Sequence, residues 1–110
     1  MDAGYTPRQV SERMARGEVQ LVDVRQPHER EAGRIAGSAH IELAELPSRA
    51  EEISRDAPVV FYCRSGARSG LATDAFRRAG FDAHNMAGGL LEWHAAGLPL
   101  DPADGYVAES

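Results

Sequence analysis

The stretch from Pro58 to Gly80 constrains the fold most strongly, because its periodicity changes at Cys63, the only cysteine of the 110-residue chain. A short β-branched and aromatic run at 59–62 precedes the cysteine and predicts a buried strand. Beyond residue 70 the apolar side chains recur at helical spacing, and Gly80 ends the pattern. These side chains are Leu71, Ala72, Ala75, Phe76 and Ala79. Residues 64–67 must then turn between strand and helix, which places Cys63 at a helix N-terminus.

A cysteine at this position is expected to ionise readily. Backbone N–H groups that lead into a helix point toward one spot, and the helix dipole adds partial positive charge there. Arg64 and Arg68 add two full charges. Such surroundings lower the pKa of a free cysteine from about 8.5 to roughly 3.5 to 7.5. An inert buried thiol is the alternative, but two arginines and a glycine within five positions favour a reactive thiolate at Cys63.

The other residues of the loop have supporting roles in this interpretation. Ser65 is predicted to cap or brace the turn, and Gly66 to allow a positive φ and a close backbone approach. Ala67 completes the loop, and Ser69 fits either a structural or a functional role. Arg68 begins the helix, where a cation opposes the dipole, so its side chain is expected to face the loop.

Two charged residues lie at the end of another predicted strand, 21–24. Strands that alternate with helices indicate an α/β domain with a mainly parallel sheet covered on both faces. Function in such sheets lies at the C-terminal edge of the strands. Asp23 is expected at this edge, in a salt bridge that holds the loop, and Arg25 as its partner or as a contact of the substrate. Both are predicted to lie behind the loop, in support of it.

The remaining elements are predicted from caps, glycine and proline stops, and periodicity. Helices are expected at 6–17, 27–32, 43–53 and 90–96, strands at 39–41 and 83–86, and a turn at 33–37. In the helix at 43–53, Pro47 is tolerable only within the first turn. The apolar face of the last helix is expected to consist of Leu90, Leu91, Trp93 and Ala96.

Composition narrows the classes of function. The net charge of -5 and the pI near 5.3 disfavour nucleic acid or an anionic membrane as the partner, since both require a basic face. A lone cysteine forms no internal disulfide, and no apolar run has the length of a signal-sequence core or a bilayer span, so a cytoplasmic location is expected. The four histidines lack ligand spacing, and we expect neither a metal site nor a cofactor.

Three segments of the chain together resemble the rhodanese family of sulfurtransferases. They are CRSGAR at 63–68 followed by Ser69, LVDVR at 21–25 with Glu29 and 33–39, and AGGLLEW at 87–93 with 96–99. The first is similar to the family's active-site loop, the second to its N-terminal signature and the third to its C-terminal signature. Arg34 and Ala36 stand where the N-terminal signature usually has histidine and proline, in a surface turn outside the loop.

The resemblance implies a fold. It predicts a three-layer α/β/α domain of the rhodanese type with a five-stranded parallel sheet, formed by residues 1–100. The first of the five strands would lie at 3–5, where periodicity alone shows nothing. Residues 101–110 follow as a C-terminal tail without a pattern, expected to pack loosely. We expect a monomer or a weak dimer.

The resemblance also implies a reaction. The Cys63 thiolate would attack the outer sulfur of thiosulfate or a similar anionic donor, sulfite would leave, and a persulfide would form on the cysteine. The acceptor would be cyanide, a thiol or an acceptor protein. Backbone N–H groups of 65–69 would stabilise the persulfide, while Arg64 and Arg68 would attract the donor.

Two other functions compete with this reaction. A non-catalytic rhodanese-like module would bind a partner or relay sulfur, although the retained Cys63 favours activity. A cysteine-dependent phosphatase or arsenate reductase would use Cys-x5-Arg, but position 69 is Ser69, and Tyr62 stands where a phosphatase usually has histidine. The sequence therefore favours sulfur transfer over phosphoryl chemistry.

Overall fold

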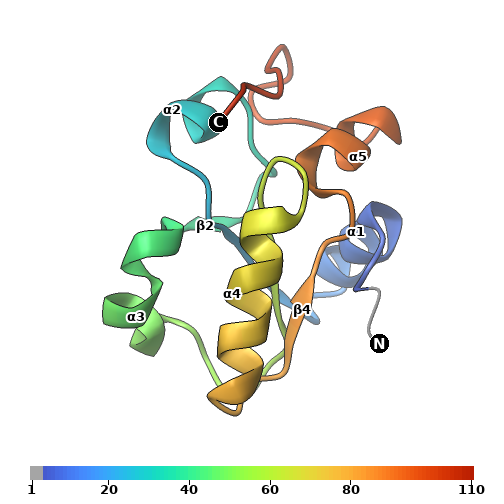
Figure 1. Cartoon of the computed structure of the whole chain (residues 1–110). Helices are drawn as coiled ribbons and strands as arrows, with labels where there is room; N and C mark the ends of the chain where they lie inside the picture. Colours follow the sequence, from blue (N-terminus) through green and yellow to red (C-terminus); the bar gives the residue numbers. More distant parts are fainter. Residues whose placement is uncertain (1–3) are drawn as a thin grey trace.

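A central parallel sheet organises the computed structural model, which describes residues 4–110 (Figure 1). The strand order is β2-β1-β3-β4, and every pairing is parallel. The strands are β1 (Gln20–Asp23), β2 (Ala39–His40), β3 (Val59–Tyr62) and β4 (Ala83–Asn85). Asp23 is in register with His40 on one side and Tyr62 on the other, so the C-terminal ends of the strands meet at one edge. The predicted α/β fold with a parallel sheet is confirmed.

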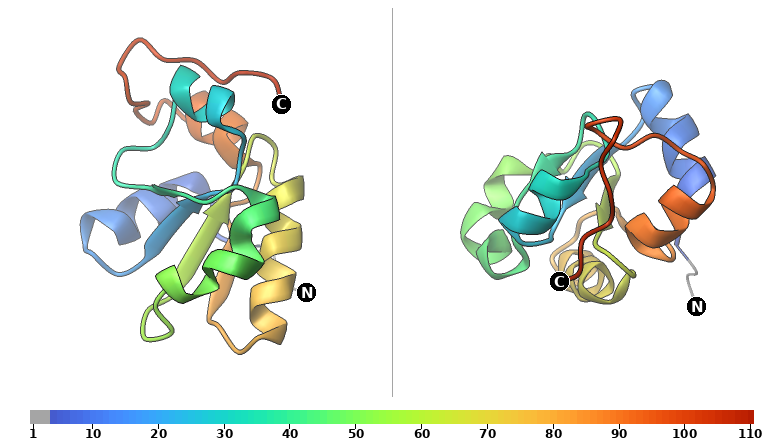
Figure 2. Two further views of the ribbon diagram at one scale, coloured as in Figure 1. Left: turned by 90° about the vertical axis from the view of Figure 1, so that its left-hand side faces the viewer. Right: turned by 90° about the horizontal axis from the view of Figure 1, so that it is seen from above.

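Helices cover both faces of this sheet, as the view from above in Figure 2 shows. The helical segments are α1 (Pro7–Ala15), α2 (Pro27–Ala32), η1 (Leu43–Glu45), α3 (Leu46–Arg49), η2 (Ala50–Glu52), α4 (Ala67–Arg78) and α5 (Gly89–Ala95). A hydrophobic core cluster lies on each face of the sheet. One cluster packs the sheet against α3 and α4, and the other packs it against α1 and α5. Helix α2 lies near the C-terminal edge of the sheet, above both layers (Figure 1).

Strand β3 shows how the two cores arise from sequence. Its four residues are completely buried, as expected for a central parallel strand whose two faces are both covered. Val59 and Phe61 point to the α4 side, where the Phe61 ring packs edge-on against Phe76 with centroids 4.9 Å apart. Val60 and Tyr62 belong to the other core, beside Trp93. The apolar run before Cys63 is therefore anchored from both sides.

Helix α1 begins as its sequence predicts. The Thr6 hydroxyl accepts a hydrogen bond from the Gln9 N–H (3.2 Å), and the Thr6 N–H donates to the Gln9 side-chain oxygen (2.9 Å). Pro7 occupies the first turn. Met14 and the fully buried Val10 pack the helix onto the sheet. The helix ends near Gly17, whose φ of 68° is left-handed.

The prediction of one continuous helix at 43–53 is wrong. The segment is divided into η1, α3 and η2, and Pro47 lies in the first turn of α3, as required. The chain leaves the helical region at Arg49, where φ is -118° and ψ is 15°. Other residues of the predicted apolar patterns are also exposed: Leu71 (65%), Ala75 and Ala79 along α4, and Leu91 (38%) on α5.

The expected fifth strand is absent from residues 4–110. Tyr5 makes one isolated parallel bridge with Met86, at the outer side of β4, where such a strand would lie. Thr6 already caps α1, so the chain turns away after this one pair. Ala3, which was assigned to the same strand, lies outside the described residues.

The C-terminal tail is packed, contrary to the expectation of a loose extension. Asp101 and Arg34 exchange two backbone hydrogen bonds of 2.8 and 3.0 Å, and the Tyr106 N–H donates to the Ala32 carbonyl (3.0 Å). These contacts hold the tail against the end of α2, which it crosses in the left panel of Figure 2. Within residues 4–110, none of the helices combines the length and apolar character that a bilayer crossing requires.

Candidate active site

Cys63 lies directly after β3, at the C-terminal edge of the sheet. Its side chain is 1% exposed. The Gly66 N–H donates to the sulfur across 3.1 Å, and the Ser69 hydroxyl lies 3.4 Å from it. Ser69 is itself buried in the first turn of α4. The loop therefore curls around the sulfur and directs hydrogen-bond donors toward it.

These donors decide the protonation of the thiol. Burial raises the pKa of Cys63, but the Ser69 hydroxyl and the backbone N–H groups of Ser69, Gly66 and Ser65 lower it by more. The pKa of Cys63 therefore lies below its ordinary value. Hydrogen bonds to a charged form favour that form, so the loop stabilises a thiolate.

The curl of the loop depends on Gly66 and on α5. Gly66 caps α4 with a left-handed φ of 102°, and its carbonyl accepts a hydrogen bond from the Asn85 side chain (3.0 Å). The N–H groups of Leu90 and Leu91 donate to the carbonyls of Cys63 (2.9 Å) and Arg64 (3.0 Å). Because the loop carbonyls are hydrogen-bonded to α5, the N–H groups of the loop face the sulfur.

Close backbone contact on this side requires Gly89. A Cβ atom at Gly89 would lie 2.6 Å from the Cys63 carbonyl oxygen and 2.5 Å from that of Arg64. The second glycine of AGGLLEW belongs to a segment that resembles a family signature, but no sequence pattern predicts a role for Asn85. The available signal was a polar residue near the end of the strand predicted at 83–86.

Arg68 has a partner that local sequence patterns did not indicate. It makes a bidentate ion pair with Glu29 of α2, with both N···O distances at 2.8 Å. Glu29 is completely buried and also accepts a hydrogen bond from the Gln26 N–H (3.0 Å). Although burial raises the pKa of Glu29, the Arg68 and Gln26 hydrogen bonds lower it to a value below normal. The expectation that Arg68 faces the loop stays a prediction, to which the structure adds that its charge is paired with Glu29.

Arg64 differs from Arg68 in this respect. It is half-buried, and its Nε atom is buried without a hydrogen-bond partner. No ion pair is formed by Arg64 in the part of the chain that the structure describes. Ser65 and Ala67, the intervening residues of the loop, are exposed. Among residues 4–110, Arg64 thus differs from Arg68 in having no carboxylate partner.

Asp23 and Arg25 form a buried pair beneath α2. The Arg25 guanidinium donates to both carboxylate oxygens of Asp23 at 2.8 Å, and its Nη2 also donates to the Gly33 carbonyl (2.8 Å). Arg30 and the Tyr62 hydroxyl complete the contacts of Asp23, at 3.3 and 3.2 Å. Both members of the pair are 0% exposed. They join β1, β3 and the end of α2, which supports the loop from below.

Known proteins with similar sequences include named sulfurtransferases. A model of the rhodanese-like domain family matches residues 6–96. A sulfurtransferase of Allochromatium vinosum is 39% identical over 87% of this chain and 92% of its own length. A thiosulfate sulfurtransferase of Pseudomonas aeruginosa is 33% identical over 90% of this chain and 89% of its own length.

Other relatives are longer than this chain. An HTH-type transcriptional regulator of Mycobacterium tuberculosis is 43% identical over 87% of this chain, which spans only 43% of the regulator. Among solved structures, a rhodanese-related protein of Thermoplasma volcanium superimposes with a TM-score of 0.83 at 27% identity, covering 88% of this chain and 95% of that protein. The structural and the sequence comparisons thus both indicate a rhodanese-like domain.

Proposed function

The chain belongs to the rhodanese-like domain family, and on this premise we propose that it is a sulfurtransferase that carries sulfane sulfur on Cys63. One observation carries the proposal: the Cys63 sulfur is 3.1 Å from the Gly66 N–H and 3.4 Å from the Ser69 hydroxyl. This geometry lowers the pKa of the thiol and so increases the fraction present as the nucleophilic thiolate.

In the first half-reaction the donor is thiosulfate or another small anion with a sulfane sulfur. The Cys63 thiolate attacks the outer sulfur, a new S–S bond forms, and the S–S bond of thiosulfate breaks. Sulfite leaves with that electron pair, and Cys63 becomes a persulfide anion. No separate general base is needed when the loop stabilises the thiolate before the donor binds.

The loop supplies the stabilisation that this step needs. Developing charge on the outer sulfur remains near the N–H groups that already face the thiolate, and such preorganised donors are the main source of transition-state stabilisation in many enzymes. Arg64 attracts the anionic donor with an uncompensated charge. We expect Arg68 to contribute less than Arg64, because its charge is paired with that of Glu29.

In the second half-reaction a nucleophilic acceptor attacks the outer sulfur of the persulfide. The bond to Cys63 breaks, the cysteine recovers its electron pair as a thiolate, and the acceptor leaves with the sulfur. Cyanide, a low-molecular-weight thiol or a protein thiol could each accept it. Because the cysteine must remain reduced between turnovers, we place the protein in the reducing environment of the cytoplasm.

Mass spectrometry of the intact protein tests the proposal. After incubation with thiosulfate and removal of the excess, we expect a mass gain of one sulfur atom, which cyanide removes. Cys63→Ser is the matched control and should show no gain. Absence of the gain in the wild-type protein, with thiosulfate and with other sulfane donors, would contradict the proposal. A gain that cyanide and thiols leave in place would instead favour a sulfur-relay module that lacks turnover.

A further inference from the structure

An apolar groove lies between α3 and α4, on the face of the sheet opposite to α1 and α5. The two helices lie side by side in Figures 1 and 2. The volume of the groove is about 480 Å3, which lies within the range of roughly 300 to 1,000 Å3 that is typical of small-molecule sites. Among residues 4–110, Arg55 is the one charged residue in its lining, and the other lining residues are apolar.

Buried side chains of the hydrophobic core form the floor of the groove. Leu46, Ala72 and Phe76 line it and are each at most 6% exposed. The rings of Phe76 and Phe81 pack against each other with centroids 4.7 Å apart. Because these side chains are held by close packing in the core, the floor is formed before any ligand arrives.

The wall of the groove on α4 is apolar although it faces solvent. Leu71, Ala75 and Ala79 recur every fourth residue along α4 and its C-cap, so they lie on one stripe of the helix. All three are exposed, and Leu71 is 65% exposed. A surface helix normally has polar residues outside its buried stripe. In α4 the apolar surface instead continues beyond the core and onto the groove.

Arg55 lies at the end of the groove that Ala79 and Phe81 form. Its Nη1 donates to the Ala79 carbonyl (2.9 Å), and its guanidinium carbon lies 4.1 Å from the centroid of the Phe81 ring. These contacts orient the guanidinium and leave Nε and Nη2, which can donate two parallel hydrogen bonds to one carboxylate. Arg55 has no carboxylate partner among residues 4–110.

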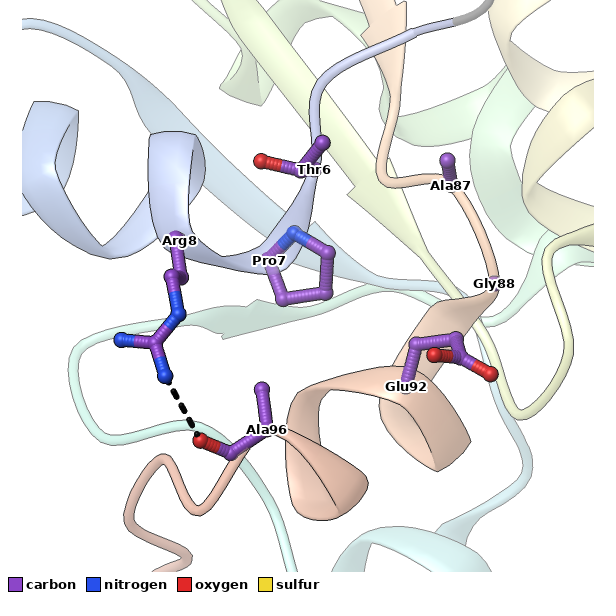
Figure 3. A pocket seen from close by; sticks show the side chains of 7 residues that line it. All are labelled: Thr6, Pro7, Arg8, Ala87, Gly88, Glu92 and Ala96. Atoms are coloured by element: carbon purple, nitrogen blue, oxygen red, sulfur yellow. Dashed lines mark hydrogen bonds between the residues drawn. The ribbon is translucent and has the colours of Figure 1, made fainter.

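A second pocket, between the start of α1 and α5, has a different lining (Figure 3). Figure 3 shows Arg8 and Glu92 on two sides of it, so the charges in its lining are of opposite sign. Arg8 donates to the Ala96 carbonyl across its mouth (3.2 Å). The groove between α3 and α4 combines one cation with an otherwise apolar lining, and it therefore specifies the chemistry of a ligand more narrowly.

This lining matches an anion that carries an apolar chain. We propose that the groove binds a small amphipathic carboxylate of the medium-chain fatty-acid type. Its carboxylate accepts two hydrogen bonds from Arg55, and its chain lies along α4 toward Leu71. Ala79 and Leu71 are about 12 Å apart along the helix axis, which suits a chain of medium length. The site goes beyond the proposed sulfurtransferase function, because no residue of 63–69 lines the groove.

Calorimetry with decanoate, below its critical micelle concentration, tests the site. We expect saturable binding of one decanoate per chain. Decanol keeps the chain without the charge and should bind at least threefold more weakly, because it loses the contact with Arg55. Butyrate keeps the charge but has little chain to bury, and it should bind at least tenfold more weakly. Absence of saturable binding of decanoate would overturn the proposal.

Two variants locate the bound molecule in the groove. Arg55→Gln should weaken decanoate binding by about three- to tenfold and leave decanol within twofold of wild type. Ala75→Glu places a carboxylate on the exposed wall at a position that a helix tolerates, and it should weaken decanoate binding at least tenfold. Arg78→Gln and Ala95→Glu are the matched controls, because both positions are exposed and outside the groove. Equal affinity in all four variants would overturn the proposal.

A second copy of this chain is the competing occupant of the groove. Sedimentation equilibrium distinguishes the two occupants. A wild-type protein that stays monomeric with and without decanoate supports the proposal. A wild-type dimer that Ala75→Glu converts to a monomer would overturn it, because the groove would then be an interface between copies. Cys63→Ser should bind decanoate as the wild-type protein does, so a failure of this site and a failure of sulfur transfer are observed separately.

Discussion

The loop at 63–69 that holds Cys63 is contacted from two sides, the α2 flank and the α5 flank, and the contacts on these two sides differ in kind. On the α2 flank, charged side chains are buried in pairs: Glu29 with Arg68 and Asp23 with Arg25. On the α5 flank, backbone groups of Leu90 and Leu91 bind the loop carbonyls, and only Asn85 adds a side-chain hydrogen bond. Charge near the sulfur thus mainly positions the loop, whereas backbone N–H groups stabilise the sulfur anion.

The difference has an energetic reason. A buried ion pair adds little net stability, because desolvation offsets the attraction, but loss of one partner leaves a buried charge and costs about 3 to 5 kcal/mol. Such pairs enforce one geometry. The α5 flank tolerates no side chain at Gly89, yet it leaves an open pocket beside the loop. One flank therefore fixes the loop through buried charges, and the other through backbone hydrogen bonds and close packing at Gly89.

The largest effect is expected from Asp23→Asn, which leaves the guanidinium of Arg25 buried without a countercharge. Unfolding in urea should show a loss of about 3 to 5 kcal/mol. Asp101→Asn is the matched control, because its ion pair with Arg34 is half exposed (50% for Asp101) and should contribute less than about 1 kcal/mol. Equal losses in the two variants would show that burial of the pair is unimportant.

Glu29→Gln should cost less, about 2 kcal/mol, because Arg68 keeps 26% of its side-chain surface exposed and water partly screens the lost pair. The pKa of Glu29 is lower in the folded protein than in the unfolded chain. Its contribution is therefore fully present above about pH 4.3 and is lost as the pH falls through the lower folded value.

The pH dependence gives a check on this assignment. The stability difference between the wild-type protein and Glu29→Gln should be constant above about pH 5 and should shrink on acidification below about pH 4.3. Urea unfolding at a series of pH values measures it. A difference that stays constant down to pH 3 would mean that the carboxylate charge of Glu29 does not stabilise the fold.

The two loop arginines should differ in donor use. Arg64→Met removes an uncompensated cation and should raise the KM for thiosulfate by about tenfold, which corresponds to about 1.4 kcal/mol. Arg68→Met, whose charge Glu29 already compensates, should raise this KM by less and should mainly lower stability. The opposite order of KM values would show that Arg68 attracts the donor more strongly than Arg64 does.

Asn85→Ala should have the smallest effect of the series. It removes the hydrogen bond to the Gly66 carbonyl, and a neutral hydrogen bond contributes about 1 kcal/mol. We expect kcat to fall about three- to fivefold with little change in the KM for thiosulfate, because the loop becomes less well positioned. A fall in stability without any change in kcat would show that Asn85 acts only on the fold.

Much of the fold was predictable because buried parallel strands are short apolar runs. The residues of β1, β3 and β4 fall within or next to their predicted ranges, and Cys63 follows β3 as expected. Helix α4 was also predicted, but Leu71 is exposed. The buried face of its first turns is instead partly polar: the Ser69 hydroxyl faces the sulfur, and the Thr73 hydroxyl donates to the Ser69 carbonyl.

The contacts of the site were less predictable than its location. Arg68 and Glu29 are 39 positions apart, so no local pattern shows that they pair, although Glu29 was part of the N-terminal signature. Asn85 acts through a side chain whose direction depends on the pairing of β4 with β3. The tail carries no periodicity, yet its backbone pairs with Arg34 and Ala32. Such contacts depend on how the strands, helices and tail are arranged in space, and the hydrophobic periodicity of the sequence does not predict them.

The central claim is that hydrogen bonds from the loop keep Cys63 as a thiolate. Because this chain has one cysteine, the ultraviolet absorbance of the thiolate can be titrated against pH without interference from another thiol. The wild-type protein should titrate clearly below the ordinary pKa of about 8.5, and Ser69→Ala should titrate at a higher pH than the wild-type protein. A wild-type titration at or above about 8.5 would contradict the account.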